Sequence, residues 1–117
     1  MRSALLLAAF VAAPFPAVRH NRLVRAEPGV DATVVKSPGQ IRLWFTEPPE
    51  LAVSSIKLAD AAAKPIPTGN VKATDDKTSI AVAVMTPLPA GKYTVTWKTA
   101  GADGHVIKGS FGFTVGT

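Results

Sequence analysis

Two histidines and one aspartate are the residues whose types and spacing could bind a metal ion. His20 follows a short apolar N-terminal stretch, and His105 ends the triplet Asp103-Gly104-His105; the chain has no other histidine. If a peptidase cuts before His20, that residue gains a free α-amine beside its imidazole. Two imidazoles, one amine and one carboxylate would then supply three nitrogens and an oxygen, and divalent copper prefers tetragonal coordination by such atoms.

Read alone, the Asp-Gly-His triplet also fits a plain turn. An Asp-Gly pair is typical of a hairpin connection in which the glycine takes a positive φ. If the triplet is extended instead, the side chains of Asp103 and His105 point the same way, about 6.6–6.8 Å apart along the strand. They could then share one ion. A strand that begins near Leu23 could bring His20, the only other imidazole, to the same end of the fold.

Residues 1–19 are predicted to be a secretory signal, and residues 20–117 a single domain. A positive residue, an apolar run over residues 4–13 and two prolines follow one another in the signal. The apolar run is shorter than the roughly 20 residues that cross a bilayer, so we expect export to the periplasm. Signal cleavage before His20, after Ala13 or after Ala17 would in each case place one unfavourable residue near the cleavage site. The sequence therefore leaves these three mature N-termini as alternatives.

Composition excludes several classes of site and partner. The chain contains no cysteine, which excludes thiolate metal sites, and Met85 is the only methionine beyond Met1. Because Cu(I) prefers sulfur ligands, the sequence favours Cu(II). The net charge of +5 comes from lysines and arginines that are spread along the chain. Such spacing is typical of solvated strand faces and argues against nucleic acid as a partner.

The pattern of apolar residues predicts an all-β fold. Alternation of apolar and polar side chains, separated by Pro, Gly and Asp turns, indicates short strands at regular intervals. This spacing favours a Greek-key β-sandwich or barrel, of the Ig-like or cupredoxin-like kind. Residues 59–64 could add one helical turn. The seven expected strands cover residues 23–27, 41–46, 55–58, 71–74, 79–84, 93–98 and 110–115.

The same alternation predicts which side chains are buried. Trp44 is out of phase with its neighbours and should face away from the core, under a loop or exposed. The other large apolar residues of the strands should point inward. These are Leu43, Phe45, Ile80, Val82, Val84, Tyr93, Val95, Trp97, Phe111, Phe113 and Val115.

Three spaced motifs resemble the CopC-type periplasmic copper-resistance proteins. The first is the start of the domain, where His20 precedes Leu23 and Pro28; the second is the strand that ends in Phe45-Thr46-Glu47-Pro48. The third is the C-terminal run of residues 93–115, which contains the Asp-Gly-His triplet. Together they cover essentially the whole predicted domain.

The resemblance implies a seven-stranded Greek-key β-sandwich that binds one Cu(II). Its ligands would be the amine and imidazole of His20, together with Asp103 and His105. Glu47 would lie behind the ligands and orient an imidazole, as carboxylates commonly do; alternatively it is an exposed residue at a strand end. Gly101 stands where the family commonly has a serine, which would loosen the loop before the triplet.

The leading interpretation is a monomeric, non-enzymatic periplasmic protein that binds Cu(II) for copper sequestration, delivery or resistance. An inner-membrane copper importer is a possible partner. One alternative is a copper-dependent monooxygenase, because an N-terminal histidine with a second histidine also forms that active site; the negative Asp103 ligand, however, would oppose redox cycling. The other alternative is an Ig-like interaction module that binds no metal, since fold alone never fixes function.

Overall fold

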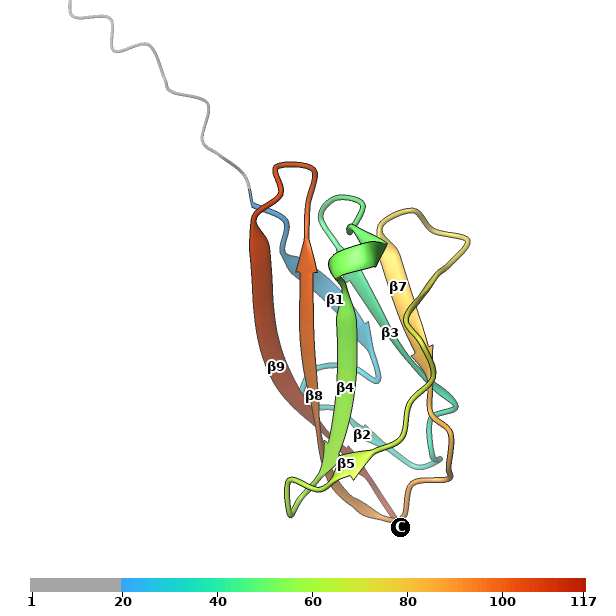
Figure 1. Ribbon diagram of the computed structural model, residues 1–117. Coiled ribbons are helices and arrows are strands. Elements are labelled where there is room, and N and C mark those ends of the chain that lie inside the picture. The colour runs from blue at the N-terminus through green and yellow to red at the C-terminus, as the bar shows by residue number, and fades with distance from the viewer. Residues whose placement is uncertain (1–19) are drawn as a thin grey trace, which may run out of the picture.

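The computed structural model describes residues 20–117 as a β-sandwich of two sheets (Figure 1). The predicted signal, residues 1–19, lies outside the described residues. One sheet has the order β1 (Leu23–Glu27), β3 (Gln40–Phe45), β7 (Ser79–Ala83), β6 (Lys72–Ala73). The other has the order β2 (Thr33–Val34), β9 (Val106–Val115), β8 (Gly91–Ala100), β4 (Ser55–Asp60), β5 (Pro65–Ile66). A single 3-10 turn, η1 (Leu51–Val53), precedes β4.

The all-β prediction is confirmed, and the two sheets form a sandwich rather than a closed barrel. All seven expected strands are present, and the described residues add two short ones, β2 and β5, to make nine. The helical turn expected over residues 59–64 is wrong. β4 continues through Asp60, whose carboxylate accepts the N–H groups of Ala62 and Lys64 at 2.9 Å each. Ala63 takes a φ of 61°, so the chain reverses into β5 instead of winding.

The core lies between the sheets and contains the side chains that the alternation placed inward, together with others that were not predicted: Ala26, Ile41, Ile56, Leu58 and Leu88. All of the predicted side chains are buried except Val84, which is half-buried. Phe45 meets Trp97 edge to face at 5.3 Å, and Tyr93 stacks on Phe113 at 5.6 Å, so aromatic contacts join residues of different strands. Trp44 faces outward as predicted. The guanidinium groups of Arg25 and Arg42 lie over its ring, each 4.5 Å from the centroid.

Strand register brings the start of the domain and the β8–β9 loop to one end of the sandwich. β8 and β9 pair over their full length, up to Ala100 opposite Val106, which leaves residues 101–105 as the connecting loop. β1 begins with Leu23 opposite Phe45, the last residue of β3. The chain therefore enters the fold beside that loop, as Figure 1 shows at the upper end. Within residues 20–117, no helix has the length and apolar character needed to cross a membrane.

Candidate metal centre

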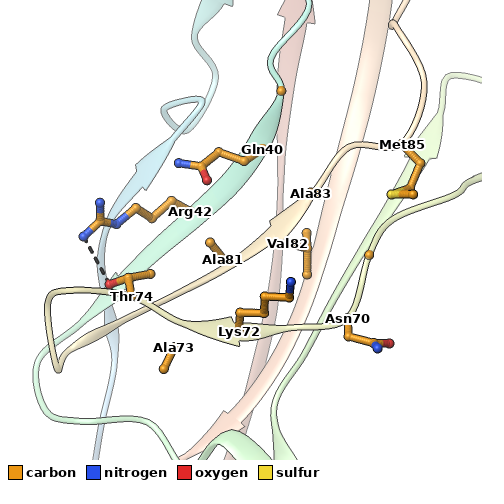
Figure 2. A pocket seen from close by; sticks show the side chains of 12 residues that line it. Gln40, Arg42, Asn70, Lys72, Ala73, Thr74, Ala81, Val82, Ala83 and Met85 are labelled. Carbon is orange, nitrogen blue, oxygen red and sulfur yellow. Dashed lines mark hydrogen bonds between the residues drawn. The ribbon is translucent and has the colours of Figure 1, made fainter.

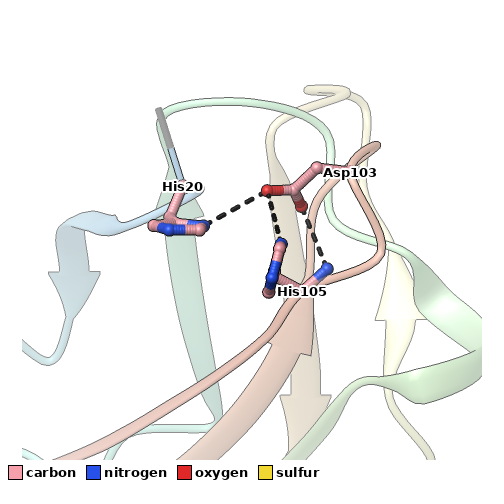
Figure 3. A group of neighbouring side chains, drawn as sticks. All are labelled: His20, Asp103 and His105. Carbon is pink, nitrogen blue, oxygen red and sulfur yellow. Dashed lines mark hydrogen bonds and ion pairs between the residues drawn. The ribbon is translucent and has the colours of Figure 1, made fainter. Parts of the chain in front are cut away.

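His20, Asp103 and His105 come together at this end of the sandwich (Figure 3). Nδ1 of His20 and Nδ1 of His105 each lie 3.2 Å from the same oxygen, Oδ2 of Asp103. The candidate ligand atoms of the three residues lie within 4.8 Å of one another. His20 precedes β1 of the four-stranded sheet, whereas Asp103 and His105 lie in the loop between β8 and β9 of the five-stranded sheet. Folding therefore brings together His20 and Asp103, which are 83 positions apart.

The Asp-Gly-His triplet is a tight turn, and the extended alternative is wrong. The N–H of His105 donates to Oδ1 of Asp103 at 3.0 Å, and the N–H of Gly104 donates to the carbonyl of Gly101 at 3.0 Å. Gly104 has a φ of +76°, a conformation that side chains disfavour. The turn nevertheless keeps Asp103 and His105 in contact. The triplet therefore forms a turn and also supplies two of the three candidate metal ligands.

The electrostatics of the cluster suit a cation. The N–H of His105 holds the pKa of Asp103 below its usual 3.8, helped by both imidazoles and opposed by partial burial. The ionised carboxylate lies between the two imidazoles, and a carboxylate oxygen and the unprotonated nitrogen of a neutral imidazole are both acceptors that a cation can bind. The side chains of His20 and His105 are 50% and 65% exposed. An ion can therefore reach the site from solvent.

A polar corner behind the histidines was missed by the sequence analysis. Asn21 is only 2% exposed, and its Oδ1 accepts the hydroxyl of Thr46 at 3.1 Å and the N–H of Glu47 at 3.0 Å. The N–H of Thr46 donates in turn to the carbonyl of Arg22 at 2.9 Å. An Asn in a polar stretch carries no periodic signal, so its burial could be found only from the structure.

The side chain of Glu47, the predicted outer carboxylate, contacts the backbone of the β8–β9 loop. Its Oε1 accepts the N–H of Ala102 at 3.2 Å. A Cβ added at Gly101 would meet Oε1 of Glu47 at 1.8 Å and Cβ of Asn21 at 3.1 Å. Gly101 was expected to loosen the loop; in the structure, the space that its missing side chain leaves is filled by Glu47.

A hollow on the four-stranded sheet lies apart from the candidate metal ligands (Figure 2). It measures about 560 Å³ and is lined by residues of β3, β6 and β7 and of the adjoining loops, including Arg42, Lys72 and Met85. The guanidinium of Arg42 is already engaged, with Thr74 at 3.2 Å and Asp75 at 3.0 Å. Histidine does not line this hollow. Among residues 20–117, the group of three side chains that could hold a metal ion is the one at the β8–β9 loop.

Comparison with known proteins agrees with this architecture. The CopC domain family model matches residues 23–116. The chain belongs to the CopC family. Copper resistance protein C of Escherichia coli is 33% identical over 108 residues, which cover 86% of this chain and 85% of that protein. Copper transport protein CutJ of Bacillus subtilis is 27% identical over 113 residues, which are 96% of this chain but 21% of CutJ.

A solved structure of the family shows the same fold. CopC from Methylosinus trichosporium OB3b superposes with a TM-score of 0.76 at 32% identity, over 83% of this chain and 94% of that one. The predicted family and the predicted sandwich are confirmed. The chain spans most of the Escherichia coli relative but about a fifth of the length of CutJ.

Proposed function

We propose that the mature chain binds one Cu(II) ion through the α-amine and imidazole of His20, Asp103 and His105. The observation that carries the proposal is the meeting of three ligand side chains, within 4.8 Å, at an exposed end of the sandwich. Signal cleavage before His20 would free the amine and complete a set of three nitrogens and one oxygen. Copper(II) favours these donors in tetragonal arrangement.

Cu(II) rather than Cu(I) is the proposed cargo because sulfur ligands are scarce. The chain has no cysteine, and Met85 is its only methionine beyond Met1. Met85 follows β7, a strand that starts opposite Trp44 near the site and ends opposite Gln40 at the far end. A solved relative, PcoC from Escherichia coli, is described as methionine rich; this chain is not. Easy removal of Cu(I) by a chelator would support the proposal, and tight retention would overturn it.

The proposed role is non-enzymatic: periplasmic sequestration, delivery or resistance. An ionised Asp103 beside both imidazoles favours the higher charge of Cu(II) and so disfavours the redox cycle of a monooxygenase. The names of two relatives, a copper resistance protein and a copper transport protein, support a role in copper handling. We extend the proposal to delivery of copper to an inner-membrane importer, because CutJ, a copper transport protein, contains a similar segment within a longer chain. We also propose that the chain acts as a monomer.

Copper titration of the exported protein tests this function. Intact mass should first show a chain that begins at His20, which leaves 98 residues (117 − 19). Visible absorption should then saturate at one Cu(II) per chain. Absence of binding would overturn the proposal and favour the metal-free interaction module. Peroxide-driven oxidation of a polysaccharide by the copper-loaded protein would favour the monooxygenase instead.

A further inference from the structure

The residue directly after His20 is anchored more firmly than its position near the start of the domain requires. β1 begins only at Leu23, so His20 lies outside the strand ladder. Asn21 is nevertheless almost fully buried, with its carbonyl oxygen held by the hydroxyl of Thr46 and the N–H of Glu47. Residues at chain termini are poorly ordered unless something ties them down. The side chain of Asn21 supplies such a tie.

The other end of the same amide is unsatisfied. Nδ2 of Asn21 is buried and has no hydrogen-bond partner within the described part of the chain. The amide cannot simply be turned over, because the N–H of Glu47 needs an acceptor at the position of Oδ1. An unpaired buried donor lowers stability, and Asn21 carries this cost while its oxygen accepts the N–H of Glu47 and the hydroxyl of Thr46. This position therefore does more than fill the core.

The corner that holds Asn21 also holds the Asp-Gly-His loop. The backbone N–H of Glu47 donates to Asn21, and its carboxylate accepts the N–H of Ala102. Gly101 packs so closely on both side chains that a Cβ there would stand 1.8 Å from Glu47 and 3.1 Å from Asn21. One corner, residues 46 and 47, thus fixes the two halves of the metal site relative to each other.

We propose that Asn21 is a positioning residue that holds the amine and imidazole of His20 in place before copper arrives. The proposal rests on the copper function proposed above. Its physical basis is preorganisation: a ligand that is already ordered loses less conformational entropy on binding. In Figure 3, His20 extends from the first residues of the described chain toward Asp103, and the hold on Asn21 fixes the direction of that approach.

The test compares Asn21→Ala in two backgrounds. In the mature protein, the substitution should weaken Cu(II) binding about 10- to 100-fold, the range seen for groups that orient metal ligands, and should alter the electron paramagnetic resonance spectrum. In a variant with one Gly added before His20, the amine no longer binds, and the same substitution should have a much smaller effect. Such non-additivity is expected only when two groups act as a unit. An equal loss in both backgrounds would show a general structural role and overturn the proposal.

Matched variants separate positioning from folding. Thr46→Val removes the hydroxyl that holds Asn21 and should weaken copper binding, whereas Thr46→Ser keeps the hydroxyl and should bind as the native protein does. Ser37→Ala is the control, because it deletes a comparable acceptor, for the N–H of Leu88 at 2.7 Å, away from the site. Native affinity in Asn21→Ala and Thr46→Val, beside a wild type that binds one Cu(II), would refute the inference alone. A wild type that binds no copper would remove the proposed function as well.

Discussion

Two loops at the same end of the sandwich contain the same aspartate-capped turn, but only one of them brings together candidate metal ligands. Asp76, in the loop before β7, accepts the N–H of Thr78 at 2.9 Å. Asp103, in the loop before β9, accepts the N–H of His105 at 3.0 Å. In each case this bond to the residue two positions ahead is the main cause of a lowered carboxyl pKa. Both loops are therefore turns capped by an aspartate.

The difference lies in what the rest of each carboxylate contacts. Oδ1 of Asp76 also accepts the hydroxyl of Thr78 at 2.8 Å, and the groups from β3 that lower its pKa further are Arg42 and Trp44, neither of which is a metal ligand. Oδ2 of Asp103 instead lies 3.2 Å from two imidazoles, one of them from His20 before the other sheet. The same turn becomes a candidate metal site when long-range folding adds a second imidazole. The comparison teaches that a turn motif gains its function from what the sandwich places beside it.

Lowering the pH should have the largest effect, because it should strongly weaken copper binding at the Asp103 loop while leaving both turns folded. Copper ligands must be deprotonated, so Cu(II) affinity should fall by more than about 100-fold between about pH 8 and pH 5. The Asp76 and Asp103 turns should persist over this range, since both carboxyl pKa values lie below 3.8. Copper retention by dialysis and secondary structure by circular dichroism would be followed together. Retention that stays flat with pH would count against amine and imidazole ligands.

Blocking the N-terminus should have the next largest effect. One Gly added before His20 turns its α-amine into an amide and removes the chelate ring between amine and imidazole, so Cu(II) affinity should fall by at least about tenfold. The apo protein should melt at the native temperature, because the turns and strands are unchanged. Competition against a calibrated chelator measures the affinity. A native affinity and spectrum in the extended protein would exclude the amine as a ligand.

Paired Asn substitutions compare the two carboxylates directly. Asp103→Asn keeps an oxygen for the N–H of His105 but replaces the charged ligand oxygen, and it should weaken Cu(II) binding by about tenfold. Asp76→Asn changes a turn of the same design and should leave copper affinity unchanged. Calorimetric titration of both variants tests the contrast. Equal losses would mean that charge near this end of the sandwich, rather than ligation, governs binding.

The smallest expected effect concerns the stability of the apo protein. A carboxyl whose pKa is lower in the folded state stabilises the fold above its unfolded pKa of about 3.8, and this contribution is lost as the pH falls through the folded value. At neutral pH, Asp76→Asn and Asp103→Asn should therefore each lower Tm slightly, by at most about 4 °C. Below the folded pKa, the variants and the native protein should melt alike. A difference that persists in strong acid would show that the carboxylate charge is not responsible.

Much of the fold could be predicted because burial repeats along the chain. Leu43, Ile80 and Val95 alternate with polar residues, and the pairing of strands follows from which faces are apolar. β5 escaped prediction because it begins at a proline, which signals a turn or a strand edge, and β2 because two residues give little periodic pattern; β6 is as short and was predicted only as the centre of a longer expected strand. The turn at Asp60 escaped because it depends on a carboxylate that caps backbone N–H groups, which competes locally with helix formation.

The candidate ligands and Glu47 behind them were predicted from the sequence, but the contacts that hold them were not. Two histidines and an Asp-Gly-His triplet are rare enough in this sequence to be singled out. Asn21 and Gly101 are ordinary residues whose importance lies in contacts across the sandwich, at Thr46 and Glu47. Such contacts depend on tertiary packing, and no local pattern encodes them.

Electron paramagnetic resonance of the mature protein with one equivalent of Cu(II), compared with His105→Ala, tests the central claim most directly. Protein labelled with ¹⁵N-histidine should give a tetragonal signal whose nitrogen couplings change with the label. His105→Ala should lose one imidazole coupling, and its Cu(II) affinity should fall by at least about 100-fold, beyond the effect of losing an orienting group. A His105→Ala protein with the native spectrum and native affinity would contradict the assignment of His105 as a copper ligand.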